Sequence, residues 1–281
     1  MGTSGSYGGP GGKNPLIPSW LDGDTATVPE ETSNPAIPAD SNQPTETTSP
    51  SKPIQGGPRF QVPKTNLARF VSSGGSNGGA LRRAVSGYVS KSSGGAATAS
   101  KRMGSSRVAA GRLLSFLGEV QRTGVAQALQ LFNLGALANR PIEDIFFGLA
   151  DQICPPNGSV DGGIALDAFT EMVVEVVESG LTSLDSLANP QIQIVFESFV
   201  ANSIFDRLIN DIGNSLIRLA QNAKEAQVLE VQVKDFIRGA VRDSVASRAP
   251  DISQITQSVA ASVTEEVYKQ AFTILESMGD S

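Results

Sequence analysis

The stretch NPQIQIVFESFVANSIFDRLINDIGNSLIRL, residues 189–219, decides the fold of this 281-residue chain. Its apolar side chains recur at three- and four-residue spacing from Ile192 to Leu219, which is typical of one face of an α-helix. Asn189-Pro190 is typical of a helix start, because asparagine caps a helix and proline fits its first turn. The sequence therefore predicts a long helix, bent or broken at Gly213-Asn214 because glycine costs about 1 kcal/mol in a helix interior.

Helical periodicity continues on both sides of this stretch. It predicts helices around residues 113–132, 142–153, 163–179, 228–245 and 255–278. Prolines support two of these bounds, with Pro141 at a helix start and Pro155-Pro156 beyond a helix end. Nothing here alternates with the period of two that marks a strand. We therefore expect an all-α fold, with about six to eight helices over residues 105–281.

The region before residue 105 has a different composition. Residues 1–106 contain 17 Gly and 11 Pro, with many serines, and bury too little apolar surface to offset an ordering cost of about 1–2 kcal/mol per residue. We expect a long, largely disordered Gly/Pro/Ser-rich region, with a motif at residues 1–20 and a tether over residues 21–104. Helical turns at 65–71 and 79–89 are too short to be stable alone and are candidates for ordering against a partner.

The formal net charge of −6 averages three dissimilar parts. Residues 1–46 carry −5, residues 47–118 carry +11 without any acidic residue, and residues 119–281 carry −12. A flexible segment of eleven positive charges suits a nucleic-acid backbone, an acidic partner protein or the acidic helical domain itself. The residues expected to make such a contact are Arg59, Lys64, Arg69, Arg82, Arg83, Lys91, Lys101 and Arg102.

The chain contains no histidine and one cysteine, Cys154. These counts exclude Ser-His-Asp and Cys-His nucleophiles, histidine-built metal sites and an intrachain disulfide. No catalytic residue, metal ligand or cofactor is expected, although an enzyme using carboxylates or lysine stays open. With no histidine to lower its pKa, Cys154 is expected to be structural.

The single thiol and the lack of a leader favour a cytoplasmic protein, and no apolar run reaches the roughly 18–20 residues that span a membrane.

Two acidic patterns are assigned to structure rather than to chemistry. The stretch that starts at Asn157 is similar to a calcium-binding loop, but Ala168 stands where the bidentate glutamate is required. A helix-connecting turn is therefore expected there. Glu171, Glu175 and Glu178 share one helical face with no cationic partner in the pattern, which predicts a solvated acidic face.

The first 20 residues, MGTSGSYGGPGGKNPLIPSW, form a further motif. Removal of Met1 would expose the unhindered α-amine of Gly2, and the start also fits a myristoylation pattern, although a single acyl chain anchors only weakly. Large anchors such as Tyr7 and Trp20 on an otherwise flexible end are typical of a docking peptide.

This motif, with the long low-complexity region and the helical carboxyl half, resembles the QatB family of the bacterial Qat anti-phage defence system. The residues that carry the resemblance are Gly2, Thr3, Ser4, Ser6, Tyr7, Gly8, Gly9, Pro10, Pro15, Leu16, Pro18 and Trp20. The resemblance implies a role beside an ATPase, a QueC-like enzyme (QatC) and a TatD-like nuclease. It further implies that Gly2 accepts a carboxyl-deazaguanine, which the QueC-like enzyme activates with ATP while gripping the residues from Thr3 to Trp20.

The expectation is a non-enzymatic anti-phage defence protein. Its N-terminal tail is bound by the QueC-like partner and modified at Gly2, and its helical domain serves as the docking scaffold. The alternative is a nucleic-acid-binding adaptor that acts through the basic residues 47–118. No membrane contact is expected in either case.

Overall fold

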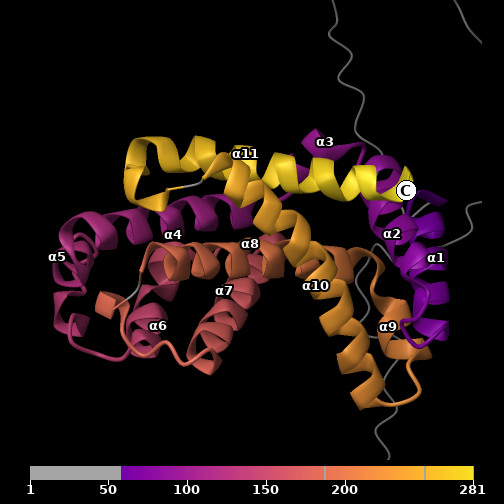
Figure 1. Cartoon of the computed structure of the whole chain (residues 1–281), viewed down its shortest axis with the longest axis horizontal. Coiled ribbons are helices and arrows are strands. Elements are labelled where there is room, and N and C mark those ends of the chain that lie inside the picture. The colour runs from indigo at the N-terminus through magenta and orange to yellow at the C-terminus, as the bar shows by residue number, and fades with distance from the viewer. Residues whose placement is uncertain (1–57, 187, 250, 281) are drawn as a thin grey trace, which may run out of the picture. The chain divides into compact units, whose positions relative to one another are not determined.

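The computed structural model of the chain describes residues 58–186, 188–249 and 251–280. In these ranges it contains eleven α-helices and no strand, which confirms the predicted all-α class (Figure 1). The helices are α1 (Gln61–Ser72), α2 (Gly78–Gly87), α3 (Ala96–Lys101), α4 (Gly104–Thr123), α5 (Val125–Gln130), α6 (Ile142–Ile153), α7 (Val160–Glu178), α8 (Asn189–Ile212), α9 (Asn214–Leu219), α10 (Ala223–Arg248) and α11 (Gln257–Ser277). A π-helix, η2 (Tyr88–Ser92), follows α2 directly.

The central helix is α8, which the opening stretch of sequence predicts. It packs against α4, α7 and α10, and α10 also packs against α11; Figure 1 shows α8 in the middle of the helical body, with α10 crossing it. Residues 195–205 are all buried, including the polar Asn202 and Ser203. α8 ends at Ile212 and α9 begins at Asn214, so the break expected at Gly213-Asn214 is confirmed.

Most other helices of the carboxyl part lie close to their predicted positions, but the range 113–132 contains two helices: α4 begins earlier, at Gly104, and α5 follows from Val125. Pro141 precedes α6 as its N-cap residue rather than as its first helical residue, and α6 ends just before Pro155-Pro156. The side chain of Asn222 caps α10 by accepting a hydrogen bond from the backbone N–H of Glu225 at 2.9 Å. Among the described residues, no helix combines the length and the apolar character that a bilayer crossing requires.

The described helical body begins at residue 58, well before the boundary at 105 that composition predicts. α1 packs against α9, while α2 and α3 pack against α11. We call residues 58–103, which contain α1, α2, η2 and α3, the N-terminal helical unit. Its side chains Leu67, Phe70, Val85 and Tyr88 are buried. The helical turns expected at 65–71 and 79–89 are therefore ordered by later helices of the same chain and do not wait for a separate partner.

Glycines make the tight connections within this N-terminal helical unit. Gly74 and Gly75, between α1 and α2, have φ values of 60° and 83°, which glycine adopts without the steric cost of a side chain. Gly94 and Gly95 adopt similar values between η2 and α3. These Gly/Ser stretches are therefore turns between packed helices.

The predicted motif at residues 1–20 and the tether up to residue 57 lie outside the described residues.

Candidate functional site

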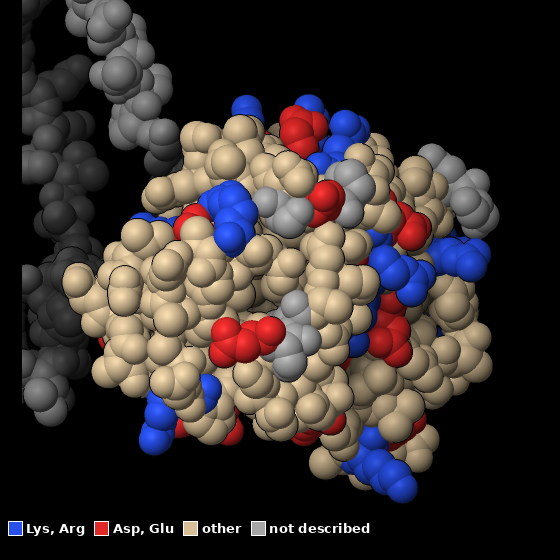
Figure 2. Space-filling model, turned by 60° about the vertical axis from the view of Figure 1, so that its left-hand side comes forward, with Lys and Arg blue, Asp and Glu red and all other residues tan. Residues whose placement is uncertain are grey.

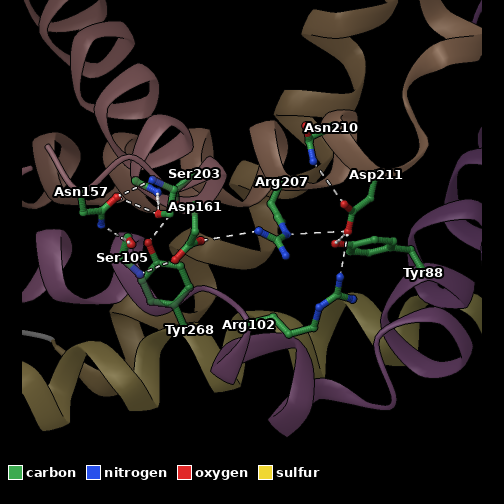
Figure 3. Close-up of polar contacts among 12 residues, drawn as sticks. Tyr88, Arg102, Ser105, Asn157, Asp161, Ser203, Arg207, Asn210, Asp211 and Tyr268 are labelled. Carbon is green, nitrogen blue, oxygen red and sulfur yellow. Dashed lines mark hydrogen bonds and ion pairs between the residues drawn. The ribbon is translucent and has the colours of Figure 1, made fainter. Parts of the chain in front are cut away.

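A half-buried charge network of Tyr88, Arg102, Asp161, Arg207 and Asp211 joins the N-terminal helical unit to α7 and α8 (Figure 3). The Tyr88 hydroxyl donates a hydrogen bond to Asp211 Oδ2 at 2.9 Å, and Arg102 Nη2 donates to the same oxygen at 3.4 Å. Arg207 lies between the two aspartates, with Nε 3.7 Å from Asp211 and Nη1 3.6 Å from Asp161. Two carboxylates face two guanidinium groups, so the network is balanced in charge.

Burial gives this charge network a structural role. The side chains of Asp211 and Arg207 are only 12% and 16% exposed. Burial, followed by the negative charge of Asp211, raises the pKa of Tyr88, which therefore stays neutral and acts as a donor. Asp161 also accepts a hydrogen bond from the backbone N–H of Ser105 at the start of α4. Removing one partner would leave a buried charge uncompensated, which is strongly destabilising.

The charge network gives Arg102, one of the predicted contact residues, a partner in the same chain. This residue was expected to contact nucleic acid or an acidic partner, but its guanidinium is engaged by Asp211 of the same chain. Arg107 lies similarly 3.8 Å from Glu265 of α11. At these two positions the acidic helical domain receives the basic segment, as one of the predicted alternatives states.

The other seven predicted basic residues are exposed. None of the seven forms an ion pair with a carboxylate of the described ranges. The seven residues are Arg59, Lys64, Arg69, Arg82, Arg83, Lys91 and Lys101. Figure 2 brings forward the end of the helical body that carries α5 and α6, away from α1 and α2. On that face cationic and acidic side chains are dispersed among uncharged ones. A contact with nucleic acid or an acidic partner stays a prediction for these seven residues and for Arg102.

The glutamates of α7 differ from the prediction of a solvated acidic face. Lys234 Nζ of α10 lies 2.8 Å from Glu171, and Arg238 Nη2 lies 2.8 Å from Glu175. Glu178 is exposed. The pattern within α7 does not show these cations because they come from a helix much later in the chain.

Asp206 of α8 is a titratable residue that the sequence analysis missed. Burial raises its pKa to about 7, the charge of Glu171 adds to the rise, and Lys234 opposes it. Its Oδ2 is buried without a hydrogen-bond partner in the described part of the chain. The only available sequence signal was an acid within an apolar helical stripe.

Cys154 has the structural role expected of it. Its thiol is buried and donates a hydrogen bond to the Ala165 carbonyl at 3.4 Å. Burial raises the pKa of the Cys154 thiol to about 12, which keeps it protonated and unreactive at neutral pH.

The loop after Cys154 is the helix-connecting turn that was predicted. Asn157 Oδ1 accepts a hydrogen bond from the Ser159 backbone N–H at 3.0 Å, and Ser159 Oγ accepts one from Gly162 at 2.9 Å. This cap starts α7 at Val160, so most of the loop similar to a calcium site is helical. In the described part of the chain, no group of three or more Cys, Asp or Glu residues is arranged to hold a metal.

Two adjoining cavities open along the exposed side of α4. The larger, of about 710 Å³, lies between α4, the end of α6 and α11, and the smaller, of about 450 Å³, lies near the starts of α4 and α7. They share Val108, Arg112 and Pro155, and we call them together the α4 groove. Val108 is 55% exposed and apolar, and the lining carries both signs of charge, with Arg107 and Arg112 beside Asp151, Asp161 and Glu265. A surface of this mixed character suits a protein segment better than a reaction centre.

The residues that the sequence assigns to modification and docking are not among those that the structure describes. Gly2 and the docking residues between Thr3 and Trp20 all lie outside the described residues. Their assignment stays a prediction.

Comparison with protein families identifies the helical part of the chain. A family model described as "Qat anti-phage system associated protein QatB" matches residues 94–275, which is more than half of the chain and runs from α3 into the last turn of α11. No curated protein and no solved structure matches the chain. The family match agrees with the resemblance that the N-terminal motif suggests, although it covers different residues. The chain therefore belongs to the QatB family and is a component of the Qat anti-phage defence system.

Proposed function

We propose that this chain is the substrate and docking scaffold of a partner enzyme in anti-phage defence, and has no catalytic activity of its own. The observation that carries the proposal is membership of the QatB family, shown over residues 94–275. The N-terminal motif supports it further, because Gly2 is small and precedes a run of apolar and aromatic anchors ending at Trp20.

The proposed reaction needs only an unhindered amine from this chain. After Met1 is removed, the α-amine of Gly2 attacks a carboxyl group that a QueC-like enzyme has activated with ATP. An amide bond forms between the Gly2 nitrogen and the carboxyl carbon, the activating group leaves, and the amine gives up a proton. Residues from Thr3 to Trp20 hold the tail in the partner's site during this step.

The chemistry of the helical body is consistent with a role as substrate. The chain has no histidine, and its one thiol is buried with a pKa raised to about 12. The charge network around Asp211 is closed by its own two arginines, which leaves no free charge for catalysis.

The α4 groove is the surface that we assign to docking of the QueC-like partner. Its volumes of about 710 and 450 Å³ adjoin along one helix. Val108 and Arg112, which both cavities share, place an exposed apolar side chain in a lining that carries both positive and negative charges. Apolar anchors surrounded by polar groups are typical of protein interfaces.

Intact mass spectrometry after co-expression with the QueC-like partner tests the modification. We expect the mass of one carboxyl-deazaguanine adduct, less water, on the peptide that begins at Gly2. A Gly2→Pro variant should lose the adduct because its amine is secondary and hindered, whereas Gly5→Ala is the matched control in the same motif and should keep it. An unmodified Gly2 amine under conditions where the defence system is active would contradict the proposal.

Docking is tested separately on the helical body. Val108→Glu places a charge in the α4 groove and should weaken co-purification with the partner, while Val231→Glu changes an equally exposed valine of α10, at 52% exposure, and should not. Equal behaviour of the two variants would remove the α4 groove from the proposal but leave the modification at Gly2 intact.

A further inference from the structure

We propose that the cavity between α1 and α9 is a binding site for a phosphate-bearing ligand of nucleotide size. The two helices pack side by side, and the cavity between them has a volume of about 440 Å³. Ligand pockets commonly measure about 300–1,000 Å³, so this cavity admits one nucleotide-sized molecule. The proposed reaction at Gly2 does not use this cavity. The residues that line it are also different from those that line the α4 groove.

Charge gives this α1–α9 cavity its chemical class. Lys64 of α1 and Arg218 of α9 line it, and no carboxylate does, although acids outnumber bases by 28 to 22 in the whole chain. Both cations are exposed and form no ion pair with a described carboxylate. Arg59 does not line the cavity: its guanidinium lies 5.7 Å from the centre of the Phe60 ring and its Nε donates to the Ser92 carbonyl. The surroundings of the cavity therefore favour an anion.

The charge network prevents a nearby aspartate from neutralising these cations. Asp211 precedes Ile212, which lines the α1–α9 cavity. Its carboxylate is 12% exposed and is bound by Tyr88, Arg102 and Arg207. Because the Asp211 carboxylate is already paired with groups of the helical body, it does not pair with Lys64 or Arg218, and these two cations remain available to a ligand.

The uncharged lining supplies the other contacts of such a ligand. The Ser215 hydroxyl is buried at the α1–α9 cavity and has no hydrogen-bond partner among the described residues, and a buried hydroxyl is normally paired. The side-chain amides of Gln61 and Asn214 line the same space. Ala68 and Ile212 form an apolar wall, against which a flat ring can pack. A phosphate beside an apolar ring is the composition of a nucleotide.

Isothermal titration of the full-length protein with ATP, AMP and inorganic phosphate tests the site. We expect saturable binding of one nucleotide per chain. Lys64→Glu or Arg218→Glu should each weaken it by at least about tenfold, because a hydrogen bond to a charged group is lost and a repulsive charge is added. Lys101→Glu and Arg248→Glu are charge-matched controls on exposed residues outside the cavity and should bind as the wild type does.

A second set of measurements separates the cavity from general electrostatic attraction. Ala68→Phe fills the cavity without a change of charge and should remove binding, while circular dichroism verifies that the helices are retained. A 5′-phosphorylated single-stranded oligonucleotide, compared with its unphosphorylated form, distinguishes the end of a nucleic acid from a free nucleotide, and dependence on Lys64 supports the site in either case. Absence of saturable binding by every phosphate probe, or equal weakening by the control variants, would overturn the proposal.

Discussion

Asp206 holds a proton near neutral pH because of where α8 places it. Burial raises its pKa from an ordinary value of 3.8 to about 7, and the nearby Glu171 contributes to the rise. The folded state therefore binds this proton more tightly than the unfolded chain does. The stabilisation is fully present below the ordinary pKa and is lost as the pH rises toward 7.

An Asp206→Asn variant tests this linkage. It removes the ionisation, so we expect it to be more stable than the wild type by on the order of 1–4 kcal/mol at about pH 8, and to gain nothing at about pH 4. Loss of the attraction to Lys234 reduces the gain. Urea unfolding across this pH range measures the effect. Asp243→Asn, on an exposed residue of α10, is the control, and an Asp206→Asn profile parallel to that of the wild type would show that Asp206 does not titrate as described.

Residues of the candidate site were predictable where the signal was local. The structural role of Cys154 and the helix-connecting turn that starts at Asn157 follow from neighbouring residues, and both are confirmed. The partner of Arg102 was not predictable, because Asp211 comes from α8 and only the folded chain brings the two together. The same reason hides Lys234 beside Glu171.

At the level of elements, local periodicity predicted α4 to α11 and composition failed for α1 to α3. The apolar stripe of α8 has a period that no turn interrupts before Gly213. α1 and α2 are short and surrounded by Gly and Ser, so their local sequence is typical of a linker. Their stability comes from packing on α9 and α11, which composition does not encode.

Gly118 shows how closely one pair of elements approaches. A Cβ atom at this position of α4 would lie 2.6 Å from the Ile255 carbonyl oxygen, which the backbone holds before α11. We expect Gly118→Ala to lower the free energy of unfolding by about 1–3 kcal/mol because the backbone must move. Gly239→Ala in α10 is the matched control: nothing lies within 4 Å of its Cβ, and alanine should stabilise that helix by about 0.5–1 kcal/mol. Thermal unfolding of both variants measures this, and a stable Gly118→Ala protein would mean that the contact is looser than described.

For the whole molecule, the N-terminal helical unit is expected to be necessary for folding of the rest. A chain that begins at residue 105 loses the buried Leu67, Phe70 and Tyr88. Burial of each such side chain contributes about 1.5–3 kcal/mol, and their sum is comparable with a total domain stability of about 5–15 kcal/mol. Removal also leaves Asp211 without Tyr88 and Arg102, and uncovers the faces of α9 and α11.

We therefore expect the chain from residue 58 to 281 to unfold in one cooperative transition, and the chain from residue 105 to 281 to be largely unfolded or aggregated. Circular dichroism with chemical denaturation compares them, and a chain from residue 21 is the control because it keeps every described helix. Equal unfolding midpoints for the chains from 58 and from 105 would show that α1 to α3 are accessory. If the expectation holds, partner binding must be mapped with residue 58 as the boundary, since loss of binding on cutting at 105 would report unfolding rather than a lost contact.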